Sequence, residues 1–303
     1  ASIPLSALAV YPMVQDLAGG AADGRVWFWN PNQPVGGLAV LGHAGPVTGL
    51  AFHPAQPQVL SVGADGWAKL WSIPAAPQVL AHPEAVAAAL PSPDGSKLLT
   101  LSADHQARLW NLGNGQMERA FPGPAQQPTT AMAWSPKGDL LAMASADKSL
   151  RLLKVADGGE ARKWEQLPAA IAALAFSPDG TQVAAAGGDN IIRLYAVADG
   201  KELGQMPGHG AAVVYLSFLP SGKLLSASAD KTARVWNLAD FKELLKVDHG
   251  GPIAAATVTA DGTVLATSGP DKQVKLWTLA DGKPAGAWAV ASGVRSLGFS
   301  GDG

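Results

Sequence analysis

A short frame recurs seven times along the chain: an aspartate, followed six residues later by a large apolar side chain. Successive aspartates lie 39 to 43 residues apart, so the frame marks a repeat that covers nearly the whole sequence. A repeat of this length is one supersecondary unit, which buries its hydrophobic face only by stacking on its neighbours. We number the units one to seven. They are DGRVWFW (Asp23 to Trp29), DGWAKLW (Asp65 to Trp71), DHQARLW (Asp104 to Trp110), DKSLRLL (Asp147 to Leu153), DNIIRLY (Asp189 to Tyr195), DKTARVW (Asp230 to Trp236) and DKQVKLW (Asp271 to Trp277).

Each unit has the pattern of four short strands joined by tight turns. An inner strand such as VTGLAF (Val47–Phe52) leads to a turn such as SPDG (Ser177–Gly180), and a strand of small residues then precedes the aspartate turn. The strand with the large apolar residue follows, and a hairpin such as ADGK (Ala280–Lys283) supplies the positive φ that a tight turn needs before an outer strand. With 35 glycines, 23 prolines and 15% charged residues, the composition favours short strands over long amphipathic helices.

Four units carry a further polar pattern: a histidine 21 or 22 residues before the aspartate, and a serine or threonine between them. This pattern resembles the WD40 repeat. The resemblance implies that indole, hydroxyl, imidazole and carboxylate form one buried hydrogen-bonded chain in which every polar group has a partner. The four sets are His43, Ser61, Asp65 and Trp71; His82, Thr100, Asp104 and Trp110; His209, Ser226, Asp230 and Trp236; and His249, Thr267, Asp271 and Trp277.

The other three units depart from this set. Units four and five have Met143 and Ala185 at the hydroxyl position and Leu153 and Tyr195 at the tryptophan position. The first unit keeps its tryptophan but has Gly19 at the hydroxyl position. Because a partly satisfied buried network costs more than none, we interpret these changes as whole networks lost together.

The resemblance predicts an all-β fold: a seven-bladed WD40-type β-propeller with four-stranded antiparallel blades, in a single domain over residues 1–303. The alanine-rich blades resemble those of bacterial WD40 proteins. The predicted blades span approximately residues 4–42, 46–81, 85–121, 129–167, 170–206, 212–247 and 252–290.

One inner strand is surplus to the seven units. The segment Val294–Phe299 has the inner-strand pattern, but no further strands follow it. Either it takes the inner position of the first blade and displaces Leu5–Val10, or the first blade closes on its own strand and the segment continues into a longer chain. An unpaired strand edge seeks a partner, so exchange of this strand between two molecules is a third possibility. We favour a longer chain, whichever of the two strands takes the inner position of the first blade.

The sequence offers no candidate catalytic or metal site. Cysteine is absent, which excludes thiolate chemistry, and a net charge of −2 provides no basic surface for nucleic acid or an anionic membrane. No apolar run approaches the ~18–20 residues that span a bilayer. His53 and His105, which lie outside the sets, have no other metal ligand at suitable spacing. The Ser-His-Asp combination recurs in four units, which indicates a structural role. We therefore expect no enzyme activity, metal or cofactor.

Six of the seven units have a basic residue two positions before the end of the frame. Strand alternation places this side chain on the same face as the terminal aromatic residue, so we expect its stem to pack over that ring. The six residues are Lys69, Arg108, Arg151, Arg193, Arg234 and Lys275, and the first unit has Trp27.

The resemblance implies a binding scaffold for a protein or peptide, which would contact loops on the face that carries the aspartate turns. Trp67 is either an exposed aromatic anchor or packs on the loop Gly42–Pro46, and the loop Pro122–Thr130 is a second candidate. We expect a monomer. The alternative is a propeller module of a larger multidomain protein whose enzymatic or signalling activity lies outside these residues. The candidate binding residues are Trp67, His105, Gln106, Lys148, Asn190, Lys231 and Lys272.

Overall fold

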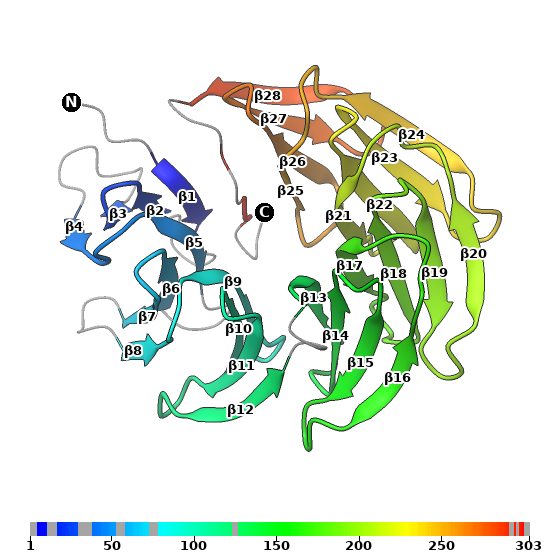
Figure 1. Cartoon of the computed structure of the whole chain (residues 1–303). Helices are drawn as coiled ribbons and strands as arrows, with labels where there is room; N and C mark the ends of the chain where they lie inside the picture. Colours follow the sequence, from blue (N-terminus) through cyan, green and yellow to red (C-terminus); the bar gives the residue numbers. More distant parts are fainter. Residues whose placement is uncertain are drawn as a thin grey trace.

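The computed structural model describes residues 5–10, 17–29, 38–52, 58–72, 78–122, 127–290, 294 and 297–299. These residues form 28 strands in seven four-stranded antiparallel sheets and contain no helix. In Figure 1 the sheets follow one another around a central axis, with the first strand of each nearest the centre and the fourth at the periphery. The predicted all-β propeller with four-stranded antiparallel blades is confirmed.

Each sheet is one contiguous stretch of chain, and its strands are neighbours in chain order. The first three sheets contain β1 (Leu5–Val10), β2 (Leu17–Ala21), β3 (Arg25–Trp29) and β4 (Leu38–Leu41); β5 (Val47–Phe52), β6 (Gln58–Gly63), β7 (Trp67–Ser72) and β8 (Gln78–Ala81); and β9 (Val86–Pro91), β10 (Lys97–Ser102), β11 (Gln106–Asn111) and β12 (Met117–Pro122).

The remaining four sheets repeat this order. They contain β13 (Thr129–Trp134), β14 (Leu140–Ser145), β15 (Leu150–Lys154) and β16 (Glu160–Trp164); β17 (Ile171–Phe176), β18 (Gln182–Gly187), β19 (Ile192–Ala196) and β20 (Glu202–Met206); β21 (Val213–Phe218), β22 (Lys223–Ser228), β23 (Thr232–Asn237) and β24 (Glu243–Asp248); and β25 (Ala255–Val258), β26 (Val264–Ser268), β27 (Gln273–Thr278) and β28 (Pro284–Ala289).

A register shift recurs where the third strand of a sheet meets the fourth. It falls immediately before the last residue of the frame, as at Trp110, Tyr195 and Trp236. A bulge of this kind bends the strand and changes the direction in which the bulged side chain points. The extra residue lies on the fourth strand, as Leu203 does in β20 and Leu244 in β24, so the fourth strand bends where it passes the large residue at the end of the frame.

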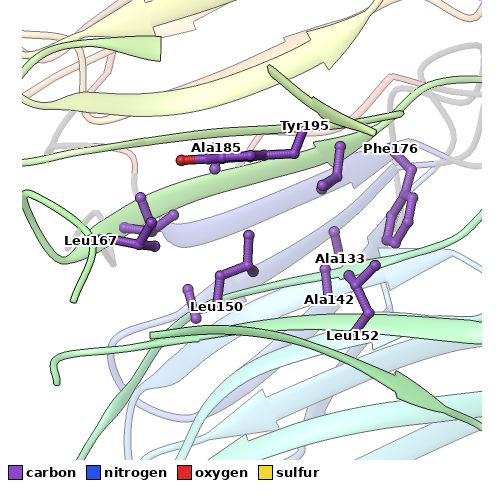
Figure 2. Close-up of a cluster of buried hydrophobic side chains, with 11 residues drawn as sticks. Ala133, Ala142, Leu150, Leu152, Leu167, Phe176, Ala185 and Tyr195 are labelled. Carbon is purple, nitrogen blue, oxygen red and sulfur yellow. The ribbon is translucent and has the colours of Figure 1, made fainter. Parts of the chain in front are cut away.

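Among the described residues, six buried clusters join the seven sheets in chain order. In each cluster the large residue at the end of the frame packs against the preceding sheet; Trp236, for example, packs with Ile192 and Leu194 of the fifth sheet. Figure 2 shows the cluster between the fourth and fifth sheets, where Tyr195 lies among Leu150, Leu167 and other apolar side chains. The core thus lies between sheets, and the second strands, such as β18 and β22, are almost wholly buried.

The first sheet uses its own inner strand. β1 pairs with β2 from Leu5↔Ala21 to Val10↔Leu17, so Leu5–Val10 holds the inner position. Of the segment Val294–Phe299, the described residues Val294 and 297–299 are not in a strand. Displacement of Leu5–Val10 by this segment is therefore not the arrangement observed.

The position of Val294 nevertheless follows the repeat. Ser268, at the end of β26, donates its hydroxyl to the carbonyl oxygen of Val294 at 3.3 Å. One unit earlier, Ser228 at the end of β22 accepts from the backbone N–H of Ile253 at 3.4 Å, just before the next inner strand. Val294 thus lies beside the seventh sheet where the inner strand of a following sheet would begin.

Candidate functional site: the polar sets and the aspartate-turn face

The second unit joins all four members of its polar set. The Nε1–H of Trp71 donates to Ser61 Oγ at 2.8 Å, and this oxygen lies 2.8 Å from His43 Nε2. The other ring nitrogen, Nδ1, lies 2.8 Å from Asp65 Oδ1. Because an indole only donates and a carboxylate only accepts, the chain fits a neutral imidazole that accepts from the hydroxyl and donates to the carboxylate.

The sixth and seventh units form the same chain. In the sixth, His209 Nε2 lies 2.8 Å from Ser226 Oγ and its Nδ1 lies 2.9 Å from Asp230 Oδ2. In the seventh, the ring of His249 is reversed, with Nδ1 next to the threonine hydroxyl and Nε2 next to Asp271. Tryptophan Nε1–H donates to the hydroxyl at 2.8 Å in both units.

The third unit differs from the predicted set. Thr100 Oγ1 accepts from the indole of Trp110 at 2.9 Å and lies 2.7 Å from His82 Nε2, but His82 Nδ1 donates to the carbonyl oxygen of Leu80 at 3.0 Å. Asp104 is bound instead by the guanidinium of Arg108. The predicted contact between His82 and Asp104 is therefore replaced by two local ones.

Burial sets the charge state of these histidines. It lowers the pKa of His43, His209 and His249 below the ordinary value of 6.5, and this effect outweighs the neighbouring aspartates, which raise it. The pKa of His82 is also lowered by burial, against the hydrogen bond that it donates to the Leu80 carbonyl oxygen, which raises it. Burial alone would raise the pKa of Asp65, but hydrogen bonds from His43 and the backbone N–H of Ala44 lower it. Each complete set is thus a neutral imidazole beside a carboxylate.

Such a set has no route to a substrate. The hydroxyl residues Ser61, Thr100, Ser226 and Thr267 are each 0% exposed, and each hydroxyl oxygen already accepts from an indole. A nucleophile must reach the atom that it attacks. Within the part of the chain that the structure describes, no group of three or more histidine, cysteine and acidic side chains could hold a metal ion. The same residues include no helix long and apolar enough to cross a bilayer.

The basic residue before the end of the frame has a polar role that the sequence did not indicate. Lysine at this position donates to the carbonyl oxygen of the histidine loop, as Lys69 does to Gly42 and Lys275 to His249. In units three, five and six the arginine pairs with the aspartate four residues before it, most closely in Arg108–Asp104 and Arg193–Asp189. Arg151 of unit four instead lies near Glu160. The residue type at this position could have indicated the partner. Only the planar guanidinium of arginine binds a carboxylate through two parallel hydrogen bonds, whereas the lysine ammonium binds as a point charge.

The residue that follows each turn aspartate has a left-handed backbone conformation in all seven units. Among the described residues, seven non-glycine residues have a positive φ, and five of them occupy this position. Where the next loop is described, the carbonyl oxygen of this residue often accepts a backbone hydrogen bond from that loop, as Lys148 does from Leu167 at 3.0 Å and Lys231 from His249 at 2.8 Å. The φ values are 86° for Gly24, 81° for Gly66, 65° for His105, Lys148 and Asn190, 77° for Lys231 and 60° for Lys272.

Five of the seven candidate binding residues thus occupy the same position, directly after the turn aspartate. The other two, Trp67 and Gln106, are the first residues of the strands that follow this turn. Lys148, Lys231 and Lys272 are exposed, whereas His105 and Asn190 are half-buried. Trp67 starts β7 with 38% of its surface exposed, and Gln106 starts β11 half-buried. His53 lies outside the described residues, as does part of the loop Pro122–Thr130.

Two family profiles match different groups of units in this chain. The sequence profile of the WD domain, G-beta repeat, matches residues 37–72, 77–111 and 242–278, which include units with a complete polar set. The profile of the anaphase-promoting complex subunit 4 WD40 domain matches residues 132–221, where units four and five lack it. A comparison with curated protein sequences finds no match.

A solved structure shares the whole fold. The crystal structure of the computationally designed Ika8 protein superposes with a TM-score of 0.81 at 25% sequence identity, over 99% of this chain and 92% of that chain. The polar sets, the stacked four-stranded sheets and the profile matches agree with one another. The chain belongs to the WD40-repeat family of β-propeller proteins.

Proposed function

We propose that this propeller is a non-catalytic scaffold that binds a protein or peptide through the face carrying the aspartate turns. WD40 propellers typically act as protein-interaction scaffolds, which supports the general role. The choice of this face rests on one observation: in units three to seven, the residue after the turn aspartate is not glycine and yet has a left-handed backbone conformation.

A left-handed conformation costs a residue with a Cβ roughly 1–2 kcal/mol, whereas glycine adopts it freely. Units one and two use glycine at this position, so the fold accepts glycine there. Units four, six and seven instead carry exposed lysines. Strained residues that are retained at the surface cluster at binding sites, and these three lysines provide cations suited to carboxylate or carbonyl groups of a partner.

The interior supports a non-catalytic role. The inner strands β9, β13, β17 and β21 surround a cavity of about 300 Å³, which is lined mainly by alanine, leucine, valine and methionine. The polar side chains among the described lining residues are Thr130 and Tyr215, and burial raises the pKa of Tyr215. A general acid–base pair requires groups that titrate near neutral pH, and this lining provides none.

We further propose that the seven sheets form a closed ring of seven blades. Six buried clusters account for six interfaces between consecutive sheets, and the contact from Ser268 to Val294 supports a role for residues near Val294 at the seventh. This arrangement leaves each sheet with its own four strands.

The binding face is tested by affinity purification of two charge-matched variants from the source cells. The first replaces Lys148, Lys231 and Lys272 by alanine. The second replaces Lys201, Lys242 and Lys283, which are exposed on the hairpins at the opposite ends of the strands. We expect the first variant to lose the proteins that co-purify with the unmodified chain and the second to retain them. Loss in the second variant alone, or retention in both, contradicts the proposed face.

A further inference from the structure

A cavity of about 270 Å³ lies between the third and fourth sheets and is partly open to solvent. Its apolar lining includes Phe121 of β12 and Met143 and Leu153 of the fourth sheet. Its polar lining includes Arg119, Thr129 and Arg151. The lining also includes Ser145 and Ser149, on either side of the aspartate turn of unit four, but none of the exposed lysines of the proposed binding face.

The cavity lies where an aromatic ring is missing. Leu153 ends the frame of unit four, a position that holds tryptophan in units two, three, six and seven and tyrosine in unit five. Between the fourth and fifth sheets, Tyr195 fills this place among buried apolar side chains (Figure 2). It is 3% exposed, and its ring centroid lies 5.3 Å from that of Trp164. An isobutyl group in place of a ring leaves space that the neighbouring sheets do not collapse to fill.

The polar lining is also particular to this unit. The inner strands β5, β9, β17 and β21 begin with valine or isoleucine, whereas β13 begins with Thr129. Threonine has nearly the shape of valine but places a hydroxyl where valine has a methyl group. Thr129 is 8% exposed, and its Oγ1 has no hydrogen-bond partner. Buried polar groups in folded proteins nearly always have a hydrogen-bond partner. A ligand in the cavity could supply the partner that the hydroxyl of Thr129 lacks.

Arg151 supplies a second unpaired group. Its Nε is buried without a hydrogen-bond partner, and it forms only a long ion pair with Glu160, whose Oε2 lies 3.8 Å away. The turn aspartate of this unit, Asp147, is held instead by Ser149, whose backbone N–H and hydroxyl donate to it at 2.9 and 2.6 Å. The frame cations of units two, three, five, six and seven each bind a carboxylate or a loop carbonyl.

The other charges in the lining are balanced. Arg119 donates to the backbone oxygens of Asp157 at 2.8 Å and Ala156 at 3.1 Å, which ties the third sheet to the fourth. Two arginines and two carboxylates, those of Asp157 and Glu160, line the cavity, so its formal charge is zero. A charged ligand would leave one charge unmatched in a site that is only partly open to solvent.

We propose that this cavity binds a neutral, single-ring aromatic group that carries an oxygen acceptor. The ring takes the space beside Leu153, and the oxygen accepts from Arg151 Nε and pairs with the hydroxyl of Thr129. The volume fits such a group, since a cavity of about 150 Å³ is enough for benzene. A phenol or a benzamide has this chemistry, and it can come from a free small molecule or from a tyrosine side chain of a bound peptide.

The proposal is tested by titrating the whole chain with phenol and benzamide, observed by NMR. We expect both to bind with a Kd of about 1 mM or lower, and about tenfold more tightly than toluene, which lacks the acceptor, or benzoate, which is charged. Equal affinity for toluene, or no binding of phenol and benzamide, overturns the proposal. A tyrosine peptide that binds while its phenylalanine counterpart does not supports a peptide source, and binding of phenol alone supports a small molecule.

Two variants locate the binding. Thr129→Val restores the residue type of the other inner strands; we expect a higher melting temperature and about fivefold weaker phenol binding. The pair Leu153→Trp and Met143→Ser rebuilds the indole and its acceptor; we expect it to abolish binding while the circular dichroism of the β-fold is retained. If phenol binds both folded variants as it binds the unmodified chain, the site lies elsewhere and the proposal is wrong.

Discussion

The guanidinium of Arg108 binds both carboxylate oxygens of Asp104, and this ion pair separates Asp104 from His82. In unit six the equivalent Arg234 binds Glu243 at 2.8 Å and Thr232 at 3.2 Å. It reaches Asp230 Oδ2 only as a longer ion pair at 3.5 Å, and Asp230 keeps its contact with His209. Unit three has Met117 where unit six has Glu243, so no second carboxylate competes for Arg108. The polar chain therefore depends on what else the neighbouring cation can bind.

This relationship predicts that Arg108→Lys restores the contact between His82 and Asp104. A lysine ammonium binds as a point charge and cannot hold both carboxylate oxygens in a planar fork. We expect His82 Nδ1 to lie within about 3.2 Å of the carboxylate in a crystal structure of the variant. A ring that still donates to Leu80 would show that the loop, and not the arginine, determines the arrangement.

Trp236→Ala tests the structural role of the sets. Trp236 is 2% exposed, and its loss opens a cavity and leaves Ser226 Oγ without its indole donor. We expect the free energy of unfolding in urea to fall by about 3–5 kcal/mol. The control is Trp288→Ala on the outer strand, where 54% of the ring is exposed and a change within about 0.5 kcal/mol is expected. Similar losses in the two variants would contradict the assignment of the core.

Lys148→Gly tests the strain at the aspartate turn. Glycine relieves the left-handed conformation at a φ of 65°, although it also increases the entropy of the unfolded chain. We expect a net gain of roughly 0.5–1 kcal/mol in unfolding free energy. Lys148→Glu keeps the Cβ and should leave stability nearly unchanged. A destabilised glycine variant would mean that the lysine side chain itself supports the turn.

The buried histidines predict a loss of stability in mild acid. Their pKa values are lowered in the folded state, so between the lowered pKa and 6.5 the unfolded chain binds more protons. Their contribution is fully present above pH 6.5 and decreases as the pH falls below it, by up to about 1.4 kcal/mol per pH unit for each proton. Urea unfolding at pH 7, 6 and 5 measures this slope, and His249→Gln should reduce it. A flat profile over this range contradicts the neutral-imidazole assignment.

A shortened chain tests the proposed closure of the ring. Removing residues 291–303 leaves Ser268 without the carbonyl of Val294, which is the contact that supports the proposed closure. We expect the unfolding free energy to decrease by at least about 1 kcal/mol, seen as a lower thermal midpoint. An unchanged midpoint would mean that this segment does not contribute to the closure.

The repeat made most of the fold predictable. The aspartate frame locates each turn and the strand that follows it, because side-chain alternation and turn geometry are local properties of the chain. The choice between Leu5–Val10 and the segment near Val294 could not be made in this way, since both have the inner-strand pattern and the outcome depends on long-range pairing.

The polar sets and the cavity were less predictable, because they too depend on contacts between residues far apart in the sequence. Spacing placed His82 and Asp104 in one set, but the competing ion pair depends on side-chain geometry in three dimensions. Leu153 and Met143 were recognised as departures from the repeat, but the cavity beside them is a property of packing between two sheets. Thr129 gave a signal that was missed: a hydroxyl at a position where other units have valine or isoleucine.

Because every sheet is one uninterrupted segment of chain, the boundary between units never cuts through a hydrogen-bonded ladder. Duplication or deletion of about 40 residues in the gene therefore adds or removes a whole sheet and tears none apart. Each sheet meets its neighbours mainly through packed side chains, so an inserted copy finds the same kind of surface on both sides. A change in the number of units therefore disturbs only the closure of the ring. The interface between the first and last sheets is the contact that restricts how many units the protein can contain.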